Sequence, residues 1–173
     1  IALLVFLGDT SAREQIVFWQ LGSLNGSRWA AVAVVAPLVL VGLAAAFTFT
    51  RQLDLLSLGE RAARHLGVNV ERLRLAAIVV VTLMVAGGVA FVGIIAFVGL
   101  VVPHLIRLAV GPAHRTLLAG SALGGALVMC IADTVARTAV DYADLPIGML
   151  TALVGGPFFL VLLRSRRQKW SVG

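Results

Sequence analysis

Long apolar runs separated by short polar connections form the main pattern of this chain. The runs extend from Trp29 to Thr50, from Leu75 to about Val110, from Leu117 to about Ala132 and from Ile147 to Leu163. A helix that crosses a bilayer needs roughly 20 apolar residues. The pattern therefore predicts an all-α, polytopic bundle of transmembrane helices.

The region from Leu75 to about Val110 has an unusual length. Its 29 uncharged residues, Leu75 to Pro103, are too many for one ordinary span and too few for two complete ones. The backbone must therefore turn within or near the membrane, where irregular backbone survives only under cover of protein or beside a water-lined cavity. Gly87-Gly88 and Gly93 are the expected turning points. A second irregularity is expected at Gly155-Gly156-Pro157, which should interrupt the last run.

The basic residues predict the orientation. Segments 51–74, 104–115 and 164–173 hold eleven Lys and Arg residues, and the rest of the chain holds three. Positive residues favour the cytoplasmic side, so these three segments are expected there. Both flanks of the long region are then cytoplasmic, which requires an even number of crossings between them. The full prediction is a partial N-terminal helix, an external loop at 9–28, about five crossings and a cytoplasmic tail at 164–173.

Composition supports an integral membrane protein, because 60% of the residues are hydrophobic and 13% are charged, whereas soluble domains are about a quarter charged. The net charge of +6 reflects orientation rather than nucleic-acid binding. The single Cys130 excludes an internal disulfide, and no Cys/His pairs have metal-ligand spacing. The chain opens in an apolar stretch, Ile1–Gly8, without a basic leader. We therefore expect one transmembrane domain, residues 1–173, forming the C-terminal part of a larger protein.

Segment 51–74 predicts a short helix. Ser57-Leu58-Gly59-Glu60 has the spacing of a capping box, in which each side chain bonds a free backbone N–H at a helix start. The helix would run to Leu66, with Gly67 ending it. Two interpretations stay open: a surface helix lying on the bilayer, or a docking element for a cytoplasmic partner.

Other positions predict contacts rather than chemistry. Asp133 and Arg137 are four residues apart and should pair on a helix. His104 should hydrogen-bond a neighbouring loop rather than bind a metal, and Arg107 should reach backbone carbonyls or headgroups. Small residues should permit close helix contact, namely Gly120, Gly124, Gly125, Gly148, Gly155 and Gly156.

Four segments together resemble one family, the FecCD permeases of ABC importers for iron–siderophore complexes, haem and cobalamin. These segments are Leu56–Glu60 with Ala63–Val68, then Phe97–Arg107, then His114-Arg115 with Gly120–Ala126 and Ala132–Arg137, and last Leu145–Ala152 with Gly155–Phe159. Their order and spacing match the family across about 50–165, and the four in register make a chance resemblance improbable.

The resemblance implies the second half of a ten-helix permease in the bacterial cytoplasmic (inner) membrane. Such a permease pairs with a second permease subunit, in a homo- or heterodimer, and works with a cytoplasmic ABC ATPase dimer and an external substrate-binding protein. It carries no catalytic residue and binds no cofactor directly, since ATP and Mg²⁺ bind the ATPase.

By the same resemblance, segment 51–74 is a coupling loop that docks on the ATPase. Its coupling residues are Ser57, Leu58, Gly59, Glu60, Ala63 and Gly67. Glu60 is either the helix cap or an ATPase contact. Arg137 would meet a glutamate of the binding protein. The residues assigned to structure or to the translocation path are Gly99, Pro103, His104, Arg107, Asp133, Pro146, Gly148, Gly155, Gly156 and Pro157.

Two other functions fit the sequence less well than an importer permease. An ion-coupled secondary transporter usually shows membrane-buried carboxylates near the midplane, but here Asp133 lies at a span's end. An intramembrane enzyme needs a nucleophile with a base or a metal cluster, and Thr82, Ser121 and Thr151 have no evident adjacent base.

Overall fold

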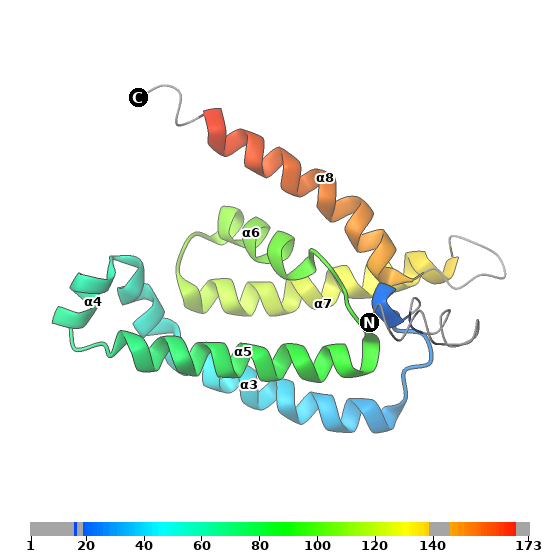
Figure 1. Cartoon of the computed structure of the whole chain (residues 1–173), viewed down its shortest axis with the longest axis horizontal. Helices are drawn as coiled ribbons and strands as arrows, with labels where there is room; N and C mark the ends of the chain where they lie inside the picture. Colours follow the sequence, from blue (N-terminus) through cyan, green and yellow to red (C-terminus); the bar gives the residue numbers. More distant parts are fainter. Residues whose placement is uncertain (1–15, 17–18, 139–145, 169–173) are drawn as a thin grey trace. The chain divides into compact units, whose positions relative to one another are not determined.

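The computed structural model describes residue 16, residues 19–138 and residues 146–168, with side chains as far as Leu160. In this part the chain is helical, without strands, as predicted (Figure 1). The helices are α3 (Trp29–Ser57), α4 (Glu60–His65), α5 (Val70–Val92), α6 (Val98–Val110), α7 (His114–Thr138) and α8 (Ile147–Gln168). The expected N-terminal helix end at Ile1–Gly8 lies outside the described residues.

Among the described residues, three helices, α3, α5 and α7, are long and apolar enough to cross a membrane. Helix α6 and residues 147–160 of α8 are apolar but shorter. The 13 residues of α6 extend about 20 Å at 1.5 Å per residue, less than the roughly 30 Å of bilayer hydrocarbon. The structure thus contains the shortened element expected in the region 75–110. The total of five crossings stays a prediction.

Large apolar side chains are exposed on the outer faces of these helices, including Trp29, which is 89% exposed, and Leu123 on α7, which is 75% exposed. A soluble protein rarely exposes so many large apolar side chains along its helices. The pattern fits helices whose outer faces contact lipid or further protein.

The chain forms two compact units, which are described separately. One contains Ser27–Phe91 with Pro103–Gly124, and the other contains Ile1–Gly26, Val92–Val102 and Gly125–Gly173.

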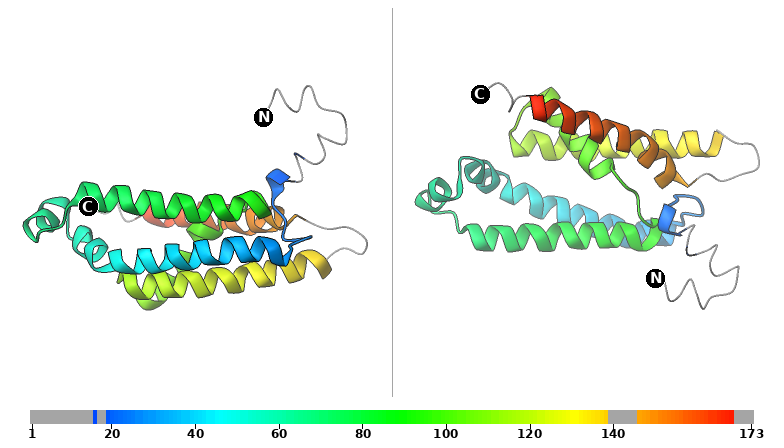
Figure 2. Two further views of the ribbon diagram at one scale, coloured as in Figure 1. Left: turned by 90° about the horizontal axis from the view of Figure 1, so that it is seen from below. Right: turned by 45° about the horizontal axis from the view of Figure 1, so that its top comes forward.

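In the first unit, α3 and α5 lie side by side (Figure 2). Glycines permit this approach: a Cβ added at Gly42 would overlap the Met84 side chain, and one at Gly87 would overlap the Leu38 side chain. Helix α5 therefore continues through Gly87-Gly88, and the turn expected there is wrong. The helix ends at Val92, so the other expected turning point, Gly93, is confirmed.

In the second unit, residues Gly93–Phe97 form an irregular connection between α5 and α6. Gly93 has φ +73° and Phe97 has φ +66°, a conformation that a bulky residue rarely adopts. The connection packs closely on residues 19–22 and on α8. A Cβ added at Gly22 would lie 2.6 Å from the Ile94 carbonyl oxygen, and one at Gly155 would lie 2.7 Å from Cγ of Phe97.

Helix α8 is continuous from Ile147 to Gln168 and includes Pro157. The expected interruption at Gly155-Gly156-Pro157 is therefore wrong. Proline removes one backbone hydrogen bond, but a membrane offers the flanking backbone no partner outside the helix, so the helical path continues. It also extends into segment 164–168, the start of the expected tail.

Candidate functional site

The connection between α3 and α5 has its own apolar core. The buried residues are Ala63, Val68, Val70 and Leu73, and the α3 side chains Phe49, Leu53, Leu55 and Leu56 pack against them. Ala63 is 0% exposed. Because the core takes side chains from α3, α4 and α5, it fixes the short helix α4 to both longer helices.

The start of α4 differs from the predicted capping box. Ser57 is the last residue of α3, and its hydroxyl donates to the Asp54 carbonyl at 2.6 Å. The N-cap of α4 is Gly59, with φ 111° and no side-chain cap bond. The capping box is therefore wrong. Helix α3 extends beyond its apolar run to Ser57, which leaves a connection so tight that it needs the backbone freedom of glycine.

The end of α4 confirms the predicted stop at Gly67. Gly67 has φ +83°, its N–H donates to the Arg64 carbonyl, and the Val68 N–H donates to the Ala63 carbonyl, each at 3.0 Å. These two bonds and the apolar contact of Ala63 with Val68 form a Schellman motif. Asn69 then caps the next helix, because its side-chain oxygen accepts the Arg72 N–H at 3.1 Å.

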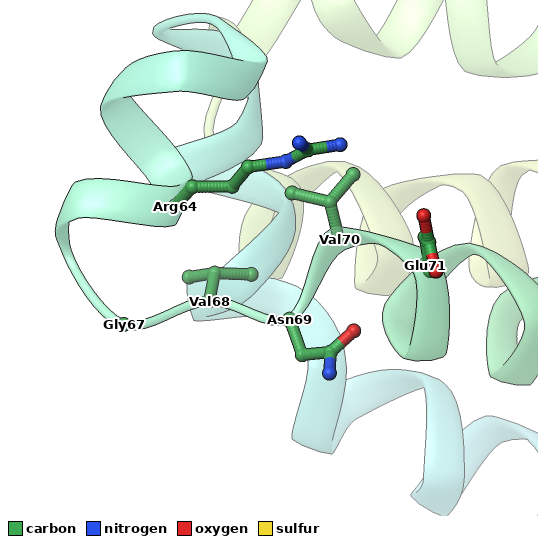
Figure 3. A pocket seen from close by; sticks show the side chains of 6 residues that line it. All are labelled: Arg64, Gly67, Val68, Asn69, Val70 and Glu71. Atoms are coloured by element: carbon green, nitrogen blue, oxygen red, sulfur yellow. The ribbon is translucent and has the colours of Figure 1, made fainter.

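Glu60 has basic partners on two elements. Its carboxylate accepts from Nη2 of Arg74 on α5 at 2.5 Å and lies 3.8 Å from Nη2 of Arg64 on α4. Figure 3 shows Arg64 reaching from α4 towards the first turn of α5, on the opposite side of the connection from Asn69. Glu60 is therefore not the predicted cap. It ties α4 to α5.

The exposed part of the connection is apolar at both ends of α4. Leu58 is 69% exposed and Leu66 is 60% exposed. Of the six predicted coupling residues, Ser57, Leu58, Gly59, Glu60 and Gly67 are exposed, whereas buried Ala63 supports them from beneath. Leu66, outside the predicted set, belongs to the same surface.

A contact that the sequence did not suggest lies between α3 and α7. Oδ1 of Asp54 accepts the backbone N–H of His114, the first residue of α7, at 2.9 Å and contacts its Nδ1 at 2.6 Å. Asp54 lies beyond the apolar run that ends at Thr50. The bond from the His114 backbone, followed by the side-chain bond, lowers the pKa of the Asp54 carboxyl below its ordinary value. A carboxylate at this position also satisfies a free N–H at a helix start. The two residues are too far apart in sequence for a local motif to reveal the pair.

The predicted pair near the end of α7 is confirmed, because Nε of Arg137 donates to Oδ2 of Asp133 at 2.9 Å. About half of the Arg137 side chain, 48%, is exposed. The arginine can therefore be held in position by Asp133 while presenting charge at the surface.

The remaining predicted residues lie on α6 and around α8. On α6, Pro103 and His104 are half-buried, and Gly99 and Arg107 are exposed. Within the described residues, the His104 imidazole has no hydrogen-bond partner, so its predicted bond is not found there. In the same part of the chain, no group of three or more His, Cys, Asp or Glu side chains could hold a metal ion.

Pro146, Gly148 and Gly155 are buried, and Pro157 is exposed. Close helix contact is confirmed at Gly120, which packs against Ile106 of α6. Gly148 and Gly155 are also closely packed, against Leu21 and Ile94 and against Phe97, which lie outside the labelled helices. At Gly125 and Gly156, no atom of the described residues lies within 4 Å of an added Cβ.

The model of the FecCD transport family matches residues 1–165 of this chain. The chain belongs to the FecCD transport family. As a FecCD protein with membrane-length apolar helices, it is a multi-pass protein of the cytoplasmic membrane.

Curated FecCD relatives match nearly the whole chain. The haemin transport system permease HmuU of Yersinia pestis is 42% identical over 98% of the chain and 51% of its own length. The cobalamin import permease BtuC of Halobacterium salinarum is 45% identical over 95% of the chain and 45% of its own length. The Fe(3+) dicitrate transport permease FecD of Escherichia coli is 44% identical over 87% of the chain and 48% of its own length. The chain thus spans about half the length of the curated relatives it matches.

A solved structure has the same fold. An inward-facing metal-chelate type ABC transporter superposes with a TM-score of 0.88 at 39% identity, covering 95% of this FecCD chain and 53% of the other.

Proposed function

We propose that this FecCD chain belongs to the transmembrane permease of a binding-protein-dependent ABC importer, which moves an iron–siderophore or related metal chelate into the cytoplasm. The match to the FecCD family over residues 1–165 carries the proposal. The relatives named above serve haemin, cobalamin and ferric citrate, and these cargoes are all metal chelates. The permease performs no covalent chemistry. ATP hydrolysis on a separate ATPase dimer drives it, and a second permease subunit and an external binding protein complete the assembly.

Within this scheme, the α3–α5 connection is the cytoplasmic coupling loop. Its exposed Leu58 and Leu66 offer the apolar contact that is typical of interface cores. The buried core holds α4 to α3 and α5, so that a force on α4 is transmitted to both helices. Glu60 acts by holding α4 to Arg74 on α5, so that a push on α4 moves α5 with it.

The test uses the full-length permease with its ATPase, substituting a neutral linker for residues 57–67. We expect membrane insertion to persist and hydrolysis to become independent of chelate transport. Arg61→Gln, which leaves the core and both leucines intact, is the matched control. Uptake and hydrolysis unaffected by the linker would refute the coupling role. Uptake without any ATP would refute the importer itself and favour an ion-coupled transporter.

Arg137 is proposed to orient the binding protein, because an exposed cation facing an acidic partner chiefly sets encounter rate and orientation. Arg137→Glu should weaken docking, and a compensating lysine on the binding protein should restore part of it. Asp133→Asn is the control, since it removes the local pair and keeps the arginine. Docking unchanged by the charge reversal would refute this role of Arg137.

A further inference from the structure

A groove lies between α3 and the beginning of α5, and we infer that it binds the headgroup of an anionic phospholipid from the cytoplasmic leaflet. This inference depends on the proposed function only for the side of the membrane on which the groove lies. The groove has a volume of about 520 Å³, within the roughly 300–1,000 Å³ of ordinary ligand pockets. Residues of α3, of the end of α4 and of the start of α5 line it, namely Phe49, Arg51, Gln52, Leu55, Leu66, Gly67, Val68, Asn69, Arg72, Leu73 and Ala76. The groove therefore shares Leu66 and Gly67 with the proposed coupling surface.

The two arginines give the groove a positive charge. Arg51 and Arg72 are exposed, and neither forms an ion pair within the described residues. Two neighbouring carboxylates contact other side chains: Glu60 contacts Arg74 and Arg64, and Asp54 contacts His114.

Glu71, the remaining carboxylate of segment 51–74, lines a neighbouring hollow of about 370 Å³ with Arg64, and this hollow shares Gly67, Val68 and Asn69 with the groove. Two arginines that line one groove, without an ion-pair partner among the described residues, suit a phosphate, which the planar guanidinium binds through two parallel hydrogen bonds.

The depth of the groove matches a lipid rather than a soluble anion. The apolar run of α3 ends at Thr50 and that of α5 begins at Leu75, so Arg51 and Arg72 lie where hydrocarbon gives way to headgroups. Phe49, Leu73 and Ala76 form an apolar wall beside them. A diacyl phospholipid matches both the basic and the apolar lining of the groove: its phosphate would contact the arginines, and its glycerol and acyl carbons would contact the apolar wall. Basic pockets between membrane helices on the cytoplasmic side bind acidic lipids in this way.

The experiment measures lipid retention by the purified full-length permease with its ATPase, using native mass spectrometry after delipidation. Phosphatidylglycerol and phosphatidylcholine with matched acyl chains are added back in turn. Wild type should retain phosphatidylglycerol preferentially. Replacing both groove arginines, in R51Q/R72Q, should reduce that preference about tenfold or more, since each arginine near an anionic surface contributes substantially.

The matched control is R61Q/R115Q, which removes the same charge from two exposed arginines outside the groove and should leave the preference unchanged. Should R51Q/R72Q fold poorly, R51K/R72K keeps the charge while losing the paired hydrogen bonds, and an intermediate preference is expected. Lipid retention is measured without nucleotide or chelate, so its failure leaves the importer proposal intact.

Three outcomes would overturn the inference. Equal retention by wild type and R51Q/R72Q would show that the arginines hold no lipid. Full displacement of phosphatidylglycerol by inorganic phosphate would indicate a soluble-anion site. Loss of the ATPase from R51Q/R72Q, with lipid retention unchanged, would make the groove part of the ATPase seat.

Discussion

The α3–α5 connection and the Gly93–Phe97 segment are both joins beside apolar helices, and they are held by different forces. The first is held by side chains: a small apolar core around Ala63 and the ion pair of Glu60 with Arg74. The second is held by backbone lying against glycine, with Gly22 beside the Ile94 carbonyl and Gly148 beside the carbonyls of Leu21 and Ile94. Side chains can adopt other rotamers after a substitution, whereas packed backbone has no such freedom. The glycine-packed join should therefore tolerate far less change.

The largest effect is expected at Gly148. A Cβ there would overlap the Leu21 carbonyl oxygen and lie 3.1 Å from that of Ile94, so backbone must move. Gly148→Ala should cost about 3 kcal/mol of stability, at the upper end of overpacking effects, measured as the melting temperature of the purified permease. Gly156→Ala, on the same helix but with no described atom within 4 Å of the added Cβ, should leave stability unchanged or raise it by up to about 1 kcal/mol. Equal melting temperatures for both variants would show that the glycine-packed join is no less tolerant of substitution than other positions.

A smaller loss is expected in the core of the other join. Ala63→Leu adds volume where Ala63 is 0% exposed, and overpacking typically costs about 1–3 kcal/mol. Displacement of α4 should also raise the ATP hydrolysed per chelate transported. Ala62→Leu, at a half-buried neighbour, is the control and should change stability by less than about 0.5 kcal/mol. If Ala63→Leu leaves coupling intact, α4 is not held by this core.

Acid should weaken the Asp54–His114 contact. The pKa of Asp54 is lowered, chiefly by the bond from the His114 backbone, so the contact stabilises the fold fully above the ordinary value of 3.8. This stabilisation disappears as pH falls through the lowered pKa. The melting-temperature difference between wild type and Asp54→Asn should therefore shrink through this acidic range, because asparagine keeps an acceptor oxygen without titrating. A difference constant with pH would contradict the assignment.

The smallest effect belongs to the exposed pair of Glu60 and Arg74. A double-mutant cycle with Glu60→Gln and Arg74→Gln should give a coupling energy of about 0.2–1 kcal/mol, decreasing with salt. The matched cycle with Arg64→Gln, at the longer distance of 3.8 Å, should give less. A larger value for Arg64 would mean that Glu60 chiefly stabilises α4 itself.

Local patterns in the sequence predicted much of this. The turn at Gly93, the stop at Gly67 and the pair of Asp133 with Arg137 depend on residues within one or two helical turns, so spacing alone revealed them. The capping box at Ser57 failed for a related reason. The extension of α3 to Ser57 accompanies the packing of Leu55 and Leu56 on the core around Ala63, and local spacing does not contain this contact.

The sequence by itself determined an all-helical membrane protein of the FecCD family, because apolar run length and short motifs are properties of neighbouring residues. Only the tertiary structure decided which glycines turn the chain and which pack it: Gly93 ends a helix, whereas Gly87 lies against Leu38. The same holds for the partners of Glu60 and Asp54 and for the groove of Arg51 and Arg72. These contacts join residues from different helices, so they exist only once the helices have packed.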